Sequence, residues 1–327
     1  MEQSTKSLEN KHFLDEERKI LILLLIVSGF VGILCLTSCQ TITNKNLPII
    51  DMHLHSWTAG YLGEAGIPNP VTGRPSSSTS DKAIMEATFA EMHRYNISLA
   101  VISGPLEVLN RWKDEAPERI IGGVHFDEVT SLPDVDKLRQ QFMSGQLGVL
   151  GELVAQNAGL SLKDSLFTPY LTLAEELDIP IGIHTGLGPA ETPYTCCPKF
   201  RVTYGNPILL EDVLVSHPKL RIYIMHGGWP YLEETKAIMS VYPRVYADLA
   251  TINWIIPREE FHDYLKDLIR AGFGKRLMFG SDQMVWPEAI GMAIEGIESA
   301  KFLSKEEKRD IFYNNAARFL KLKEAVE

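Results

Sequence analysis

The chain has 327 residues, of which 45% are hydrophobic and 23% charged, so it has the composition of a globular protein with ample length for one large core. Its formal net charge is −10, and the sequence contains no long run of Lys and Arg. A polyanion would be repelled by this charge, so we expect no nucleic acid as substrate or partner.

The N-terminal segment is predicted to be a lipoprotein signal peptide, residues 1–39. Arg18 and Lys19 precede an almost wholly apolar run, Ile20–Leu36, which is the pattern of a secretory signal peptide. Leu36-Thr37-Ser38-Cys39 looks like a bacterial lipobox, in which the cysteine is lipidated and becomes the first mature residue. An uncleaved signal anchor is the alternative, because the apolar run is near the lower length limit for a membrane span.

Residues 40–47 are expected to be a short polar tether between this segment and the body of the protein. Either interpretation of the leader places the body outside the cytoplasm, at a membrane to which it is anchored. If the host has two membranes, Gln40 rather than Asp after the cysteine favours the outer one, by similarity to other lipoproteins.

Residues 48–327 are predicted to form one α/β domain, a (β/α)8 TIM barrel. Short apolar runs alternate with amphipathic stretches such as Asp81–Asn96, whose apolar residues recur at helical spacing. Eight strands alternating with helices favour a closed parallel barrel over an open sheet. The predicted strands are Pro48–His55, Ile97–Gly104, Ile120–Phe126, Gly148–Leu153, Pro180–Gly186, Leu220–Gly228, Val245–Ala250 and Arg276–Asp282.

Two long loops are expected near the mouth of this barrel. Trp57–Ser80, rich in Gly, Pro and Ser, is predicted to cover the site, and a second loop after the fifth strand carries the adjacent cysteines Cys196 and Cys197. This pair could form a vicinal disulfide in an oxidising compartment or stay reduced. Arg74 and Arg201 lie in these loops, where they could bind a substrate carboxylate or simply be solvated. The mouth is expected to contain aromatic residues: Trp57, Tyr61, Trp229, Trp254 and Trp286.

Side chains that can bind a metal ion fall at the ends of five predicted strands, where the active sites of such barrels lie. The first strand ends in His53 and His55, which share one face because alternate strand residues point the same way. The other residues at strand ends are Glu152, His184, His226 and Asp282. Imidazole and carboxylate ligands together suit Zn²⁺ or a similar divalent cation.

Each of these residues taken alone also has a purely structural interpretation. Glu152 could stabilise a loop, Asp282 could cap a helix, and a lone histidine such as His125 is more often a hydrogen-bonded structural residue. The convergence of ligand-type side chains at the ends of several different strands is what favours a metal site over this interpretation.

The sequence resembles the amidohydrolase superfamily, in particular the amidohydrolase-related branch of metal-dependent barrel hydrolases and decarboxylases. The resemblance covers roughly Pro48–Leu322 and includes the segments IIDMHLH, HPKLRIYIMHGG, VYADLA, RLMFGSD and IFYNNAARFL. It implies that His53, His55 and Asp282 bind the first metal ion. In single-metal members the residue at His184 completes the site and that at His226 polarises the substrate. In two-metal members a carboxylate at Glu152 bridges the ions, and both of these histidines bind the second.

The expected chemistry is hydrolysis of a small amide, lactone or ester by metal-activated water, with Asp282 moving the proton and His226 as ligand or hydrogen-bond donor. Asp248 is expected to orient a metal-bound histidine or to be structural. The alternatives are a non-oxidative decarboxylase, a TatD-like nuclease and a surface binding lipoprotein without activity. Substrate, hydrolysis against decarboxylation, metal identity and number, and oligomeric state are not determined by the sequence.

Overall fold

The structure is a computed structural model that describes residues 47–126 and 132–322. By its internal contacts the chain divides into units of residues 1–47 and 48–327, and all described residues except Leu47 belong to the second. The predicted signal peptide and residues 40–46 of the predicted tether lie outside the described residues. Within the described part of the chain, no helix is long and apolar enough to cross a membrane.

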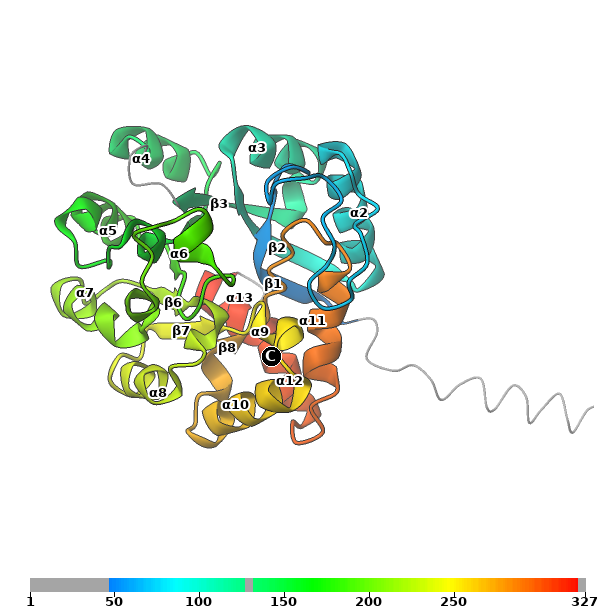
Figure 1. The fold of residues 1–327 in the computed structure, drawn as a ribbon. Helices are drawn as coiled ribbons and strands as arrows, with labels where there is room; N and C mark the ends of the chain where they lie inside the picture. Colours follow the sequence, from blue (N-terminus) through cyan, green and yellow to red (C-terminus); the bar gives the residue numbers. More distant parts are fainter. Residues whose placement is uncertain (1–46, 127–131, 323–327) are drawn as a thin grey trace, which may run out of the picture. The chain divides into compact units, whose positions relative to one another are not determined.

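The second unit is an eight-stranded barrel in which each strand pairs in parallel with the next, in sequence order (Figure 1). The ring closes between its first and last strands, where Met52 N donates to Phe279 O at 2.9 Å and His55 N to Gln283 O at 3.2 Å. The predicted (β/α)8 barrel is thereby confirmed. The strands are β1 (Ile49–His55), β2 (Ile97–Gly104), β3 (Ile120–Phe126), β4 (Val149–Leu153), β5 (Ile181–Ile183), β6 (Ile222–Ile224), β7 (Val245–Asp248) and β8 (Leu277–Met278).

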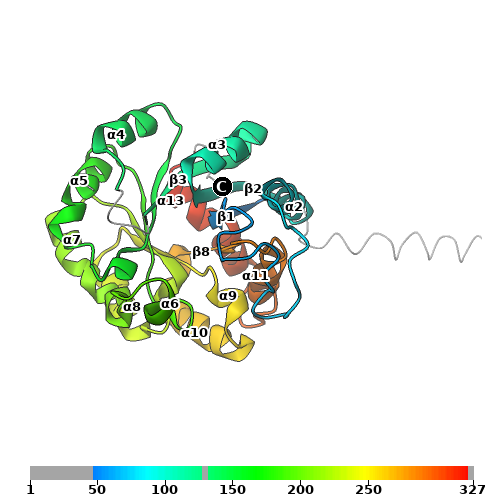
Figure 2. The ribbon, with the colours of Figure 1, turned by 45° about the horizontal axis from the view of Figure 1, so that its top comes forward.

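Helices surround the strands (Figure 2). Two short helices, α6 (Thr192–Thr195) and α9 (Ile252–Ile255), lie in loops that follow strands. The others are α2 (Asp81–Arg94), α3 (Leu106–Glu115), α4 (Val135–Met143), α5 (Thr168–Glu176), α7 (Glu211–Ser216), α8 (Leu232–Val241), α10 (Arg258–Arg270), α11 (Ala289–Glu298), α12 (Lys305–Arg309) and α13 (Asn315–Leu320).

The later strands are shorter than the sequence predicted. The expected strand Leu220–Gly228 ends at Ile224, because His226 and Gly227 both take a φ of 59°, which turns the chain out of the extended conformation. The backbone thus leaves the sheet where the functional side chains begin, and that is where barrel enzymes place their catalytic loops.

Two hydrophobic cores hold the barrel. The larger lies between the strands and the surrounding helices and includes Ile102, Trp112 and Ile224. The smaller fills the inside of the barrel with residues of β1, β2, β4, β6, β8 and α13, and with one residue just after β6. Its buried members are Ile50, Met52, Val101, Val149, Tyr223, Met225, Met278, Ala316, Ala317 and Phe319. Because apolar side chains fill this interior, the polar residues are confined to the opposite, C-terminal end of the strands.

A backbone irregularity in β1 separates the interior core from the polar end. Met52 belongs to the interior core, yet the next side chain, His53, also points inward toward residues of other strands. The pairing of β1 with β2 shifts register between Asp51 and Leu54, and such a bulge re-aims the side chains that follow it. His53 and His55 therefore share the inner face, as predicted.

The loop 57–80 is fixed to the segment that follows β8. Asn69 Nδ2 donates to Glu288 Oε1 at 3.2 Å, Ser76 Oγ donates to Val285 O at 3.2 Å, and Trp286 Nε1 donates to Ile67 O at 2.9 Å. Trp57 and Tyr61 at the start of this loop stack on each other with ring centroids 3.8 Å apart. The loop is thus bound to another part of the barrel mouth, in agreement with its predicted position.

Candidate metal centre

The six residues predicted to form the site are brought together at the C-terminal end of the barrel. His53 and His55 end β1, Glu152 lies in β4, and the other three follow β5, β6 and β8: His184, His226 and Asp282. All are buried except His184, which is partly exposed. Ligand atoms of these residues form three overlapping triads, and within each triad the atoms lie within 4.8 Å of one another.

One half of the cluster joins the β1 histidines to two carboxylates. His55 Nε2 lies 3.4 Å from Glu152 Oε2 and 3.1 Å from Asp282 Oδ1. His53 Nε2 lies 3.8 Å from Glu152 Oε2 and 3.7 Å from Asp282 Oδ1. Two imidazole nitrogens and two carboxylate oxygens thus face a common centre, which matches the donor set and number that divalent zinc prefers.

The other half of the cluster involves the second oxygen of Glu152. His184 Nδ1 lies 2.6 Å from Glu152 Oε1, and His226 Nε2 lies 3.7 Å from the same oxygen. The two histidine nitrogens are 3.1 Å apart. Glu152 therefore stands between two groups of histidines and presents a different oxygen to each.

The outer ring nitrogens of two histidines are held by groups that only accept hydrogen bonds. His53 Nδ1 lies 3.2 Å from Asp248 Oδ2, and His226 Nδ1 lies 3.3 Å from the carbonyl oxygen of Ala250. In the neutral form of either imidazole Nδ1 therefore carries the proton, which leaves Nε2 with a free lone pair directed into the cluster. For His55, Nδ1 pairs with Ser103 Oγ at 3.1 Å, so its Nε2 also points inward.

Asp248 binds both halves of the site through its two oxygens. Oδ2 accepts from His53, while Oδ1 accepts the backbone N–H groups of His226 and Ala250 at 2.9 and 3.0 Å. It is fully buried. This geometry agrees with the predicted role of Asp248 in orienting a histidine, a role that commonly supports metal ligation.

Asp282 is oriented by a neighbour from the loop after β7. The hydroxyl of Thr251 donates to Asp282 Oδ2, which leaves Oδ1 facing the β1 histidines. His226, Thr251 and Asp282 have φ values of 59°, 61° and 49°. Non-glycine residues adopt this left-handed region at an energetic cost, and such residues concentrate at functional sites.

The electrostatics of the cluster favour a bound cation. Burial alone would raise the pKa of Glu152, but hydrogen bonds from His184 and His226 hold it well below its ordinary value. Burial likewise opposes ionisation of Asp282, yet the charge of His53 keeps its pKa low. Burial would lower the pKa of His53, but the carboxylates of Asp282 and Asp248 raise it well above the ordinary value. Both carboxylates are therefore ionised and attract positive charge, whether a proton on His53 or a bound cation.

Two buried polar atoms of the cluster have no hydrogen-bond partner among the described residues: His53 Nε2 and Asp282 Oδ1. Leaving such atoms unpaired costs about 1–3 kcal/mol each, more for a charged group. Both are ligand-type atoms, and both face the centre between Glu152 and the β1 histidines. The residues present therefore fit a divalent cation.

Other side chains predicted at the mouth have varied positions. Trp254 and Trp286 are buried and donate to backbone carbonyls, so they serve packing. Trp229 Nε1 donates to Glu260 Oε1 at 3.2 Å. Arg74 is exposed, and Arg201, also exposed, donates to the carbonyl oxygens of Pro198 and Phe200.

The sequence did not decide whether the adjacent cysteines form a disulfide or whether His125 has a role in the site. Cys196 and Cys197 form a vicinal disulfide in the structure. His125 lies beside the cluster. Its Nδ1 is 3.7 Å from Glu152 Oε2, and its ring contacts Trp57 edge-to-face at 4.6 Å.

Three groups of the site were not predicted from the sequence: Ser103, Thr251 and the carbonyl oxygen of Ala250. Ser103 is the penultimate residue of β2 and lies opposite His55 in the sheet, so its position in the predicted strand was the available signal. Thr251 and Ala250 gave no such signal, because their positions depend on how the chain turns after β7.

The model of the amidohydrolase family matches residues 50–322. The protein fluG of Emericella nidulans is 25% identical over 114 residues, which cover 35% of this chain. The chain spans only 12% of the length of that relative.

Solved structures share the fold at low sequence identity. A probable 2-pyrone-4,6-dicarboxylic acid hydrolase from Acinetobacter baumannii is 15% identical, with a TM-score of 0.61 over 84% of this chain and 100% of its own. A 5-carboxyvanillate decarboxylase from Novosphingobium aromaticivorans, determined with bound manganese, is also 15% identical. Its TM-score is 0.57 over 85% of this chain and 98% of its own.

Proposed function

This chain belongs to the amidohydrolase family and is an enzyme of that family, and on this basis we propose that it is a hydrolase of small amides, lactones or esters that holds two divalent cations. The observation that carries the proposal is the position of Glu152. Its Oε2 faces His53 and His55, and its Oε1 faces His184 and His226. A carboxylate with a different oxygen directed at each of two histidine groups is the arrangement expected of a bridging ligand.

In this proposal His53, His55 and Asp282 hold the first ion, His184 and His226 the second, and Glu152 contacts both. We propose Zn²⁺ as the ion, because the donors are imidazoles and carboxylates, with another divalent cation such as manganese as the alternative. A bound divalent cation would polarise a substrate carbonyl and lower the pKa of a water molecule toward about 7.

The residues of the chain supply positioning and proton transfer. The lowered pKa of Asp282 keeps its carboxylate ionised, so this carboxylate can accept the proton of the attacking water, and the Thr251 hydroxyl fixes its orientation through Oδ2. The same carboxyl then returns the proton to the leaving nitrogen or oxygen. Because Nδ1 of His226 donates to the Ala250 carbonyl, we assign His226 as a ligand through Nε2 rather than as a hydrogen-bond donor to the substrate.

Metal content and product analysis together test this function. Elemental analysis of the purified protein should find about two divalent ions per chain, and His184→Ala should retain about one. A panel of amides, lactones and esters is then assayed beside aromatic carboxylic acids, with release of CO2 measured in parallel. Release of CO2 without any hydrolysis would replace the proposal with a decarboxylase. A metal content of one ion in the unmodified protein would refute the bridging role of Glu152.

We also propose that the protein is a membrane-anchored lipoprotein whose body lies outside the cytoplasm. The support is the apolar run Ile20–Leu36 followed by Leu36-Thr37-Ser38-Cys39. Labelling of expressing bacterial cells with a radioactive fatty acid should mark the protein, and Cys39→Ser should abolish the label. If the label persists in this variant, the proposed site of lipidation is wrong.

A further inference from the structure

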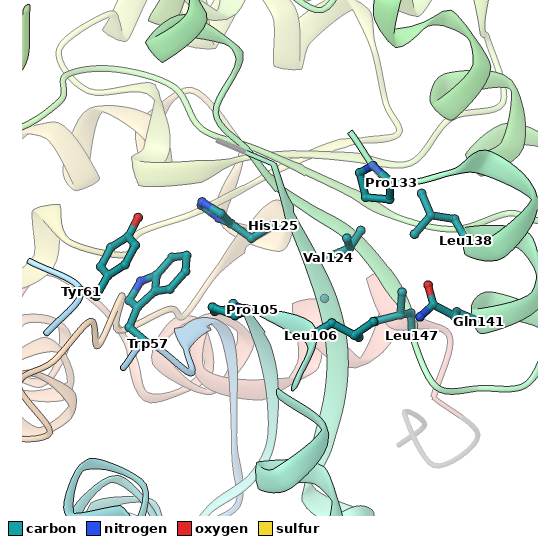
Figure 3. Close-up of a pocket in the computed structure, with 12 residues that line it drawn as sticks. Trp57, Tyr61, Pro105, Leu106, Val124, His125, Pro133, Leu138, Gln141 and Leu147 are labelled. Carbon is teal, nitrogen blue, oxygen red and sulfur yellow. The ribbon is translucent and has the colours of Figure 1, made fainter. Parts of the chain in front are cut away.

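A cavity of about 310 Å³ opens beside the metal centre, between the ends of β2 and β3 and the neighbouring helices. Figure 3 shows Trp57, Tyr61 and His125 at one end of it and Pro133, Leu138 and Leu147 at the other. Its volume lies at the lower limit of sites that bind small molecules, about 300–1,000 Å³. It is large enough for one arm of a substrate.

The end of the cavity formed by Trp57 and His125 adjoins the metal centre. The Trp57 ring stacks on His55 with centroids 4.9 Å apart, and the His125 ring is 6.0 Å from the same histidine. His125 Nδ1 is also 3.7 Å from Glu152 Oε2. The rings of Trp57 and His125 therefore lie between the cavity and the metal centre, so an arm that runs from the metal centre into the cavity passes these two side chains.

The lining of the cavity is almost uncharged. The far end is formed by Leu138, Leu147 and Pro133, with Val124 and Leu106 along the sides. None of the described lining residues is Lys, Arg, Asp or Glu, and His125 is the one lining side chain able to take a positive charge. A carboxylate buried at the far end would have no cation to pair with and would bear a large desolvation cost. An alkyl or aryl group would gain hydrophobic burial there.

We propose that this cavity binds a neutral apolar arm of the substrate, so that the enzyme prefers amides, lactones or esters carrying an alkyl or aryl group over those with a second carboxylate. The inference rests on the proposed function, since it assumes that the reacting group lies at the metal centre. Trp57, with its flat ring shared between His55 and the cavity, forms the wall past which the arm extends.

Binding of acyl hydroxamates tests the cavity without requiring turnover. These compounds chelate divalent ions, so the metal-loaded enzyme should bind a series with acyl chains of two to eight carbons, measured by calorimetry. We expect Kd to fall about fourfold for each added methylene until the cavity is full, because each buried methylene adds a fixed increment of hydrophobic free energy. Hydroxamates of equal length that end in a carboxylate should bind much more weakly than their neutral counterparts.

Two variants that fill the cavity localise the effect. Leu106, at the start of α3, is 40% exposed and lines the cavity, so Leu106→Trp should narrow it with little risk to folding. Val124→Phe narrows it from β3. Both should abolish the gain from longer chains and leave binding of acetohydroxamate unchanged. Leu166→Trp is the matched control, because Leu166 is 39% exposed and does not line the cavity.

The outcomes separate this inference from the proposed function. If Kd depends on chain length and both variants remove this dependence, but no matching ester or amide is hydrolysed, the cavity proposal holds and the proposed hydrolase function is refuted. Hydrolysis with no chain-length dependence, or equal affinity for carboxylate-ended compounds, would overturn the cavity proposal alone. The cavity proposal is also overturned if no hydroxamate of the series binds the metal-loaded enzyme. It is overturned as well if Kd depends on chain length equally in both variants and in the unmodified protein.

Discussion

Asp248 Oδ2 accepts a hydrogen bond from His53 Nδ1 at 3.2 Å, and this contact directs His53 Nε2 toward Glu152 and Asp282. The other oxygen, Oδ1, is committed to two backbone N–H groups, those of His226 and Ala250. The side chain therefore has one permitted orientation, with an acceptor facing His53.

Asp248→Asn should weaken metal binding severely without removing any ligand. In the Asn variant the two backbone N–H groups hold the side-chain oxygen at the position that Oδ1 has in Asp248. The side-chain NH2 group must then face His53 and donate to its Nδ1. This moves the ring proton of His53 to Nε2, which can then no longer bind a cation. We expect affinity for the first ion to fall about 10- to 100-fold or more, measured by titration of the apoprotein. Affinity equal to that of the control Asp212→Asn would contradict this tautomer argument.

Glu152→Gln should affect both halves of the site. The amide keeps the size of the side chain but replaces one of the two oxygens with a donor, so it can serve only one group of histidines. We expect the metal content to fall from about two ions to one or none, while Glu176→Gln on exposed surface of α5 leaves it unchanged. If the Glu152→Gln protein retains both ions, the two histidine groups bind them without a bridge.

Removal of metal should lower thermal stability. The cluster holds unpaired buried ligand atoms and two carboxylates at close range, and a cation that binds only the folded state stabilises it by mass action. At a free ion concentration 100 times Kd this amounts to about 2.7 kcal/mol. Calorimetry should show the melting temperature falling by several degrees on chelation and recovering when Zn²⁺ is added. An unchanged melting temperature would argue against any ion in the cluster.

Gly182→Ala should destabilise the barrel through its interior core. A Cβ at this position in β5 would lie 2.4 Å from the hydroxyl oxygen of Tyr223 and 2.6 Å from the terminal methyl of Met225. Tyr223 is fully buried, so it cannot move aside, and overpacking of this kind costs about 1–3 kcal/mol. Denaturant unfolding measures the loss. Gly60→Ala is the control, since its Cβ would meet only an ordinary contact at 3.5 Å.

Asp178 should make stability depend on acid pH. Burial acts to raise its pKa, but hydrogen bonds from Lys321 and Arg221 lower the pKa below the ordinary value of 3.8. Arg221 Nε donates to Asp178 Oδ1 at 2.8 Å. Because the pKa of Asp178 is lower in the folded than in the unfolded protein, its carboxylate stabilises the fold. This stabilisation is fully present above about pH 3.8 and is lost as the pH falls through the pKa of the folded state. The difference in melting temperature between the unmodified protein and Asp178→Asn should therefore shrink as the pH is lowered from 6 toward 2. A constant difference would exclude this electrostatic origin.

Much of the fold could be predicted because it depends on local patterns. The alternation of apolar strands with amphipathic helices predicted eight strands, and the order β1 to β8 follows from the right-handed connections of such units. The strand ends were less predictable. The chain turns out of β6 at His226 because this residue takes a left-handed φ, and the hydrophobic pattern of the sequence does not predict that dihedral angle.

The donors of the site could be identified from the amino-acid order alone, because histidines and carboxylates at strand ends of a barrel must meet at its C-terminal mouth. Their arrangement could not. The division of the two Glu152 oxygens between separate histidine pairs, the proton positions that Asp248 and Ala250 impose, and the uncharged cavity beyond Trp57 and His125 all depend on atoms from different strands coming within a few ångströms. Distances of that kind arise from long-range packing, which no local pattern of residues encodes.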